Sequence, residues 1–92
     1  MTIIKIPAIE FQLPTSVSIA KGSTYIVPRG IYYVKCGTNI VAEWTPDGLN
    51  WYTIISAGNS GILISDGVSV RLRNTSTKSS DSATIQRIII SI

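Results

Sequence analysis

β-Branched side chains dominate this sequence and fall into short runs. Isoleucine, valine and threonine make up about a third of the chain; such side chains lose rotamer freedom in a helix but pack well on a pleated sheet. The runs alternate in polarity and are separated by turn residues at intervals of about 8–12 residues, a spacing typical of sandwiches and barrels. The sequence therefore predicts an all-β fold, a small antiparallel β-sandwich, jelly-roll-like or immunoglobulin-like, with about seven to nine short strands and no substantial helix.

The length of the chain limits it to one hydrophobic core, because 92 residues are too few for two domains. We expect a single β-sandwich domain over residues 1–92. A chain of this size buries only about 60–65% of the surface that its unfolded form exposes, so partners are expected to cover more of it. The apolar runs are far shorter than the ~20 residues that a membrane span needs, and no membrane span is predicted.

Catalytic side chains are scarce, since the chain has no histidine, one cysteine and five carboxylates. Cys36 has no partner for an intramolecular disulfide, and no Cys or His spacing fits a zinc site. Asp47 and Asp66 each precede a glycine, where an aspartate typically caps a turn with its own side chain. We therefore predict a protein that is not an enzyme, with no catalytic residue, no metal and no cofactor.

The net charge of +3 is spread along the chain rather than clustered, so no specific nucleic-acid partner is predicted. Arg71 and Arg73 alternate with apolar residues and are expected to face solvent; a phosphate-binding stripe is the alternative. The N-terminal segment lacks the basic start, the long apolar stretch and the cleavage site of a signal peptide. Synthesis and use inside a cell are the resulting expectation.

A hairpin is predicted around Asp47-Gly48, with a loop of either two or four residues. Both loops set Trp44 opposite Trp51 on adjacent strands, with Tyr52 on the other face. One or both indoles are expected in the core. The alternative is an exposed aromatic platform of Trp44, Trp51 and Tyr52 for a sugar ring or a protein partner.

A second hairpin is predicted around Ser65-Asp66-Gly67. A three-residue loop there pairs Ile64 with Val68, which matches apolar side chains across the two strands. Val68, Val70 and Leu72 would then face the core.

Residues 74–82 form the one low-complexity segment, rich in Ser, Thr and Asn. These residues compete for backbone hydrogen bonds and bury little surface. We expect an exposed, mobile loop over this segment.

Both ends of the chain carry more isoleucine than one core-facing side can hide. We predict that they form an interface with copies of this chain or with another protein. The alternative is that both end strands lie centrally in a two-sheet core. The candidate interface residues are Ile3, Ile4, Ile6, Ile88, Ile89, Ile90 and Ile92.

Three segments together resemble the layout of small β-sandwich modules in the structural proteins of phage and other virus particles. They are PRGIYYV (28–34), EWTPDGLNW (43–51) and GVSVRLRNTS (67–76), followed by a closing strand. The resemblance implies a virion structural protein, first a capsid decoration (cement) or minor capsid subunit and next a tail or spike subunit. It also implies assembly in the host cytoplasm as a homo-oligomer, with a major capsid or tail protein as a further partner.

The Asp-Gly-x-x-Trp turn is also similar to one in discoidin-like carbohydrate-binding modules, which are longer than this chain. The alternative function is therefore a carbohydrate-binding module that takes a glycan on its exposed aromatic side chains.

Overall fold

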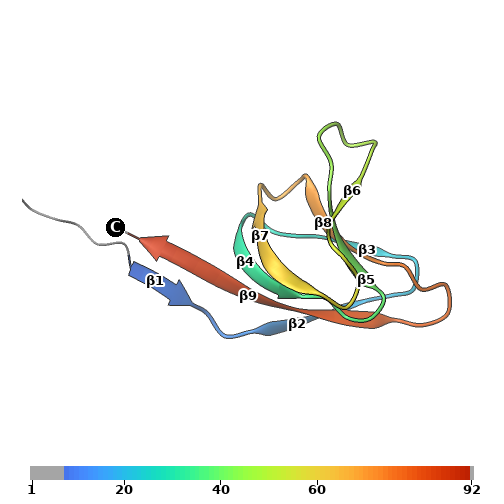
Figure 1. Ribbon diagram of the computed structural model, residues 1–92, viewed down its shortest axis with the longest axis horizontal. Coiled ribbons are helices and arrows are strands. Elements are labelled where there is room, and N and C mark those ends of the chain that lie inside the picture. Colours follow the sequence, from blue (N-terminus) through green and yellow to red (C-terminus); the bar gives the residue numbers. More distant parts are fainter. Residues whose placement is uncertain (1–7, 92) are drawn as a thin grey trace, which may run out of the picture.

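The computed structural model describes residues 8–91, which fold into two antiparallel β-sheets (Figure 1). This part of the chain contains nine strands and no helix, so the all-β sandwich predicted from composition and alternation is confirmed. The strands are β1 (Ala8–Phe11), β2 (Thr15–Ile19), β3 (Thr24–Ile26), β4 (Gly30–Lys35), β5 (Ile40–Trp44), β6 (Tyr52–Ile55), β7 (Ser60–Ser65), β8 (Val70–Asn74) and β9 (Asp81–Ser91).

The long strand β9 organises the larger, five-stranded sheet. On one side it pairs with β4, which in turn pairs with β7. On its other side β2 pairs with its first half and β1 with its second half. The smaller sheet has four strands in the order β3-β8-β5-β6.

The core lies between the two sheets and is built from alternate residues of each strand. In β4, Tyr32 and Val34 point into it, and in β8 so do Val70 and Leu72. The period-2 alternation of a β-strand explains this arrangement, because successive side chains point to opposite faces. The expected inward orientation of Val70 and Leu72 is confirmed.

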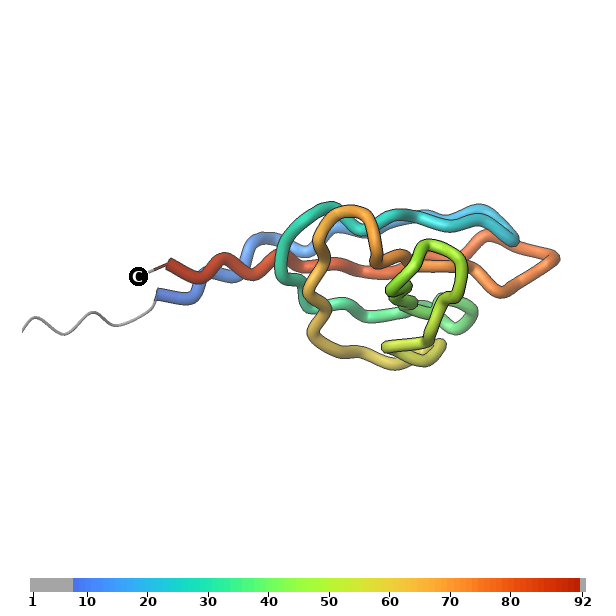
Figure 2. The backbone as a smooth tube through the Cα atoms, turned by 90° about the horizontal axis from the view of Figure 1, so that it is seen from above, coloured from blue at the N-terminus to red at the C-terminus, as the bar shows by residue number. Residues whose placement is uncertain are grey.

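One end of the larger sheet continues as a two-stranded arm, which we define as Ala8–Phe11 together with residues 88–91. The pairing of β4 with β9 stops at Ile88, opposite Ile31. In the described chain, β9 therefore pairs with β1 alone beyond that point. Figures 1 and 2 both show the arm extending away from the body of the sandwich. The radius of gyration is accordingly 15.2 Å, against the ~12 Å of a compact chain of this length.

The predicted hairpin around Ser65-Asp66-Gly67 is wrong, because β7 and β8 belong to different sheets. β7 pairs with β4, and β8 pairs with β3 and β5. The turn therefore carries the chain from one sheet to the other, and Val68 in this turn is exposed instead of facing the core. Apolar matching between neighbouring segments cannot tell a hairpin from such a crossing, because both place apolar residues inward.

The segment 74–82 is more structured at its ends than the sequence suggested. Asn74 is the last residue of β8 and only 1% exposed. Its side-chain amide donates hydrogen bonds to the carbonyls of Ile19 and Ser79. Because β9 begins at Asp81, the connection outside the strands is limited to residues 75–80.

Candidate interaction surfaces

A row of apolar side chains crosses the outer face of the larger sheet, the face turned away from the core. Ile64 lies opposite Ile31, Ile31 lies opposite Ile88, and Ile88 lies opposite Phe11. Residues paired in this way project from the same face of a sheet. The row therefore runs without interruption over four strands, β7, β4, β9 and β1.

Two more apolar pairs flank this row on the same face. Tyr33 lies opposite Ile62, and Ile9 lies opposite Ile90 in the arm. All of these outward side chains except Ile31 and Ile88 are among the exposed large hydrophobic residues. We call this surface the apolar half-face; its members are Ile9, Phe11, Ile31, Tyr33, Ile62, Ile64, Ile88 and Ile90.

The other half of the same sheet face is polar. Lys35 lies between Ser60 on β7 and Thr84 on β9, and Thr84 lies opposite Ser16 on β2. One sheet face thus changes from apolar to polar along its strands. Contiguous exposed apolar areas typically mark binding surfaces.

The isoleucines that the sequence singled out fall in different places. Ile90 belongs to the apolar half-face and is exposed, whereas Ile88 belongs to it but is only 9% exposed, beneath its neighbours in the row. Ile89 is partly exposed on the opposite face of the arm, opposite Glu10. The remaining candidates, Ile3, Ile4, Ile6 and Ile92, lie outside the described residues.

Sequence reasoning missed most of the apolar half-face. Ile62 and Ile64 lie on the outer face of β7, and Ile9 and Phe11 lie on that of β1. The sequence did carry a sign of it, because β7 reads SGILIS and has apolar residues on both of its faces. A strand that is apolar on both faces is covered on both sides or has an interface on one.

The predicted pairing of Trp44 with Trp51 is wrong. Trp44 lies opposite Tyr52, with their ring centroids 6.4 Å apart and tilted by 37°. Trp44, Tyr52 and Ala42 share one face of the β5–β6 ladder, while Thr53 lies on the other face, opposite Glu43. Tyr52, which the sequence placed on the other face, therefore lies on the same face as Trp44.

The loop over residues 45–51 explains the different register, because its own side chains set its length. Thr45 Oγ1 accepts a hydrogen bond of 2.8 Å from the Gly48 N–H. Asp47 Oδ1 accepts from the N–H groups of Leu49 and Asn50, at 2.9 and 2.8 Å. These contacts stabilise a longer turn than the two-residue or four-residue loops considered from the sequence.

Trp51 is separated from the other two aromatic residues and contacts a cation instead. The guanidinium carbon of Arg71 lies 3.8 Å from the centre of its indole, a cation–π distance. Arg71 projects from the outer face of β8, on the side away from the core. The platform of three aromatic residues is thus divided, with Trp44 and Tyr52 together and Trp51 against Arg71.

Arg71 and Arg73 are held by one carboxylate on the outer face of the smaller sheet. Glu43 Oε1 accepts hydrogen bonds from the Nε of both arginines, at 3.0 and 2.9 Å, and Oε2 accepts one of 3.1 Å from Arg73 Nη2. Burial raises the pKa of Glu43, but the hydrogen bonds and charges of both arginines outweigh it and lower the pKa overall. The same contacts raise the pKa of Arg73.

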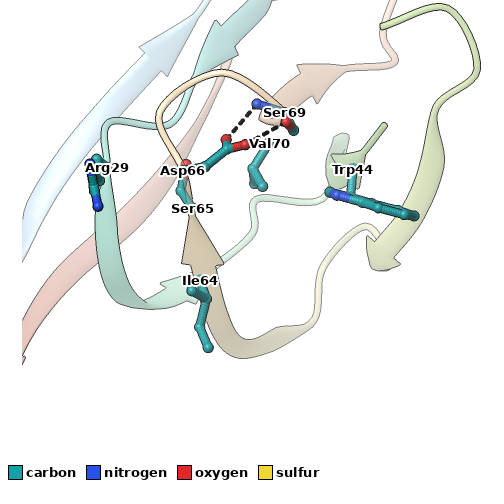
Figure 3. A pocket seen from close by; sticks show the side chains of 7 residues that line it. All are labelled: Arg29, Trp44, Ile64, Ser65, Asp66, Ser69 and Val70. Atoms are coloured by element: carbon teal, nitrogen blue, oxygen red, sulfur yellow. Dashed lines mark hydrogen bonds between the residues drawn. The ribbon is translucent and has the colours of Figure 1, made fainter. Parts of the chain in front are cut away.

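An open pocket of about 500 Å³ lies between Trp44 and the turn that joins β7 to β8 (Figure 3). Asp66 holds this turn: its carboxylate accepts hydrogen bonds from the Ser69 hydroxyl and from the N–H groups of Ser69 and Val68. These contacts lower the pKa of Asp66 to about 2. The lining residues are Arg29, Trp44, Ile64, Ser65, Asp66, Ser69 and Val70.

Residues 8–91 contain no group of three His, Cys, Asp or Glu side chains that could hold a metal ion.

No helix in these residues is long and apolar enough to cross a membrane. Cys36 is buried, and this burial raises the pKa of its thiol.

No family model, no curated protein sequence and no solved structure matches this chain.

Proposed function

We propose that this protein is a structural assembly subunit that docks its apolar half-face against a second copy of the same chain. The observation that carries this proposal is the uninterrupted row Ile64, Ile31, Ile88 and Phe11 across four strands. Two sheets with apolar faces pack on one another at a separation of about 10 Å, as they do inside a sandwich. A second copy would supply the missing sheet.

The half-face suits a copy of itself because none of its eight side chains is charged. A two-fold dimer brings the same patch together on both subunits, so a charged patch would place like charges together. Lys35 lies at the polar end of the face, beyond Tyr33 on β4. Pairing the apolar halves in opposite directions would therefore leave both Lys35 side chains toward solvent.

Covering these side chains would favour association. Covering a half-exposed isoleucine contributes about 1 kcal/mol, roughly half the value for complete burial. Several such side chains can together offset an association cost of about 4 kcal/mol or more. The small core of a chain of this length also gains stability by mass action when a partner binds its folded state.

The arm supplies a second contact for assembly. Its outer strand β1 is an edge strand of the larger sheet, and its apolar pair Ile9 and Ile90 is exposed. An exposed strand edge can pair with a strand of another chain. The arm would thus extend the dimer contact beyond the body of the sandwich.

The setting that we propose for this assembly is a virus particle. The support is the resemblance of three sequence segments to small virion β-sandwich modules, together with the apolar half-face. A capsid decoration or minor capsid subunit is the first form of this proposal, and a tail or spike subunit is the second.

A matched pair of substitutions tests the assembly proposal. Ile62 and Ser60 project from the same face of β7, two residues apart, and both are exposed. Ile62→Lys is expected to leave the chain folded and to weaken self-association at least about tenfold, by placing a charge in the interface. Ser60→Lys, in the polar half, is expected to change association little. Equal association of both variants and the wild type in sedimentation would contradict the proposal.

Co-purification tests the virion setting separately. A decoration or tail subunit should remain with intact particles through density-gradient centrifugation. A wild-type chain that dimerises but never accompanies particles would refute the setting and leave the dimer in place.

A further inference from the structure

We propose that the pocket beside Trp44 binds a neutral hexopyranose, a function beyond the proposed assembly; Ile64 is the one lining residue that also belongs to the apolar half-face. The pocket lies at one end of the sandwich, with Trp44 of β5 on one side and the turn of Asp66 and Ser69 on the other (Figure 3). It combines an aromatic ring, short apolar walls and several polar side chains. A sugar ring presents the matching surfaces, apolar C–H groups and a rim of hydroxyls.

Trp44 provides the apolar side of this site. The residue is 44% exposed to solvent, although it lies opposite Val70 at a position that faces inward. Tyr52 lies beside it, with the ring centroids 6.4 Å apart, and does not line the pocket. An exposed indole in a fixed position buries a large area at a small loss of conformational freedom.

Asp66 provides a preorganised acceptor on the opposite side. Its Oδ1 already accepts two backbone hydrogen bonds, from Val68 and Ser69. Its Oδ2 accepts only the hydrogen bond of 2.6 Å from the Ser69 hydroxyl, so one acceptor position of Oδ2 remains. The Ser69 oxygen can also accept. A sugar hydroxyl placed here would donate to a carboxylate that is ionised and already oriented, which strengthens the bond.

Arg29 provides the donors. Within residues 8–91 its guanidinium makes no ion pair and no side-chain hydrogen bond, and its residue is exposed at the pocket. The five N–H donors of a guanidinium are arranged to reach two neighbouring oxygens, as on adjacent ring carbons. Because the charges of Arg29 and Asp66 cancel, the site favours a neutral sugar over a charged one.

The size of the pocket agrees with this ligand. Its volume of about 500 Å³ lies within the ~300–1,000 Å³ of small-molecule sites. The pocket is open, and a single sugar ring would keep part of its surface in water. We expect a dissociation constant on the order of 1 mM for a monosaccharide, with tighter binding only for a multivalent glycan and an oligomeric protein.

The direct test is a titration of the ¹⁵N-labelled chain with the methyl glycosides of glucose, galactose, mannose and N-acetylglucosamine, and with methyl glucuronide. At least one neutral glycoside should shift the Trp44 indole N–H and the amides of the 65–69 turn. If no neutral glycoside shifts these signals at about 50 mM, the site is refuted. Binding of the glucuronide without any neutral glycoside would contradict the neutral-sugar assignment.

Two tryptophans give a matched pair for the same titration. Trp44→Ala should weaken binding about tenfold or more, the effect of losing about 1.4 kcal/mol. Trp51→Ala removes an indole outside the pocket and should keep the affinity within about twofold. Equal losses, or no loss in either variant, would overturn the assignment.

A second pair covers the case in which Trp44→Ala unfolds. Arg29→Gln changes an exposed residue and should reduce affinity while the thermal unfolding temperature stays unchanged, whereas Lys21→Gln, an exposed cation outside the pocket lining, should leave both unchanged. Unaltered affinity in Arg29→Gln would contradict the site. Ile62→Lys, which is expected to weaken self-association, should still bind sugar. Sugar binding and assembly can therefore be tested separately.

Discussion

Glu43 and Arg71 lie directly opposite each other on β5 and β8, and Arg71 Nε donates to Glu43 Oε1 at 3.0 Å. Arg73 donates to the same carboxylate from the next outward position of β8. The Glu43 side chain is only 6% exposed, so the two guanidiniums replace most of its water. A carboxylate buried in this way depends on both partners for its charge.

We predict that Glu43→Gln lowers the free energy of unfolding by about 1–2 kcal/mol. The variant loses charge-assisted hydrogen bonds and leaves two arginines near each other, while the solvation of Arg73 limits the cost. Urea unfolding measures the change. Glu10→Gln, at an exposed position of β1, is the control and should change stability by less than about 0.5 kcal/mol. Equal effects of the two substitutions would contradict the role of Glu43.

Acid should destabilise the fold through Asp66. Its pKa is lowered to about 2 by the Ser69 hydroxyl and by the N–H groups of Ser69 and Val68. A carboxyl with a lower pKa when folded contributes stability above its unfolded pKa and loses it as the pH falls toward the folded value. The lowered pKa of Glu43 acts in the same direction.

We therefore predict that the urea midpoint falls as the pH is lowered from the ordinary aspartate value of 3.8 to about 2. Asp66→Asn should be less stable than the wild type near neutral pH and should lose part of this acid dependence. A wild-type midpoint that stays constant or rises over this interval would show that the turn does not favour the ionised carboxyl.

Two leucines should respond very differently to truncation. Leu72 is fully buried between the sheets, whereas Leu49 is 84% exposed in the β5–β6 loop. Leu72→Ala should cost about 2–5 kcal/mol because it leaves a cavity, and Leu49→Ala less than about 0.5 kcal/mol. Thermal or urea unfolding measures both. A small loss for Leu72→Ala would mean that the interior between the sheets is not well packed.

Alternation in the sequence predicts the two faces of β8 correctly. In β8, Val70 and Leu72 face the core while Arg71 and Arg73 face outward. This success has a local physical cause, because successive side chains of any strand point to opposite faces. The all-β class could be predicted from composition for a similarly local reason, the preference of β-branched residues for strands.

Strand partners could not be predicted in the same way. Whether the chain turns back after β7 to form a hairpin or crosses to the other sheet depends on the contacts of β7 with β4, whose paired residues lie 25 or more positions earlier in the chain. The register of Trp44 depends on the hydrogen bonds of Thr45 and Asp47, which make the loop longer than common hairpin loops. The apolar half-face follows from these pairings, since only the order β7-β4-β9-β1 aligns its isoleucines.

The pocket could not be predicted from the sequence either. Trp44 ends β5 in the smaller sheet, and Asp66 lies in the turn that joins β7 of the larger sheet to β8 of the smaller one. The sequence treats these two segments as separate hairpins. Their approach depends on how the two sheets pack, which no single strand pattern encodes.

Sedimentation velocity of the wild-type chain over a concentration series tests assembly through the apolar half-face most directly. We expect the sedimentation coefficient of the wild type to rise with concentration to that of a dimer or a larger oligomer. The coefficient of Ile62→Lys should stay at the monomer value over the same range. A wild-type chain that remains a well-behaved monomer at high micromolar concentration, with no affinity for any particle, would contradict the assembly function.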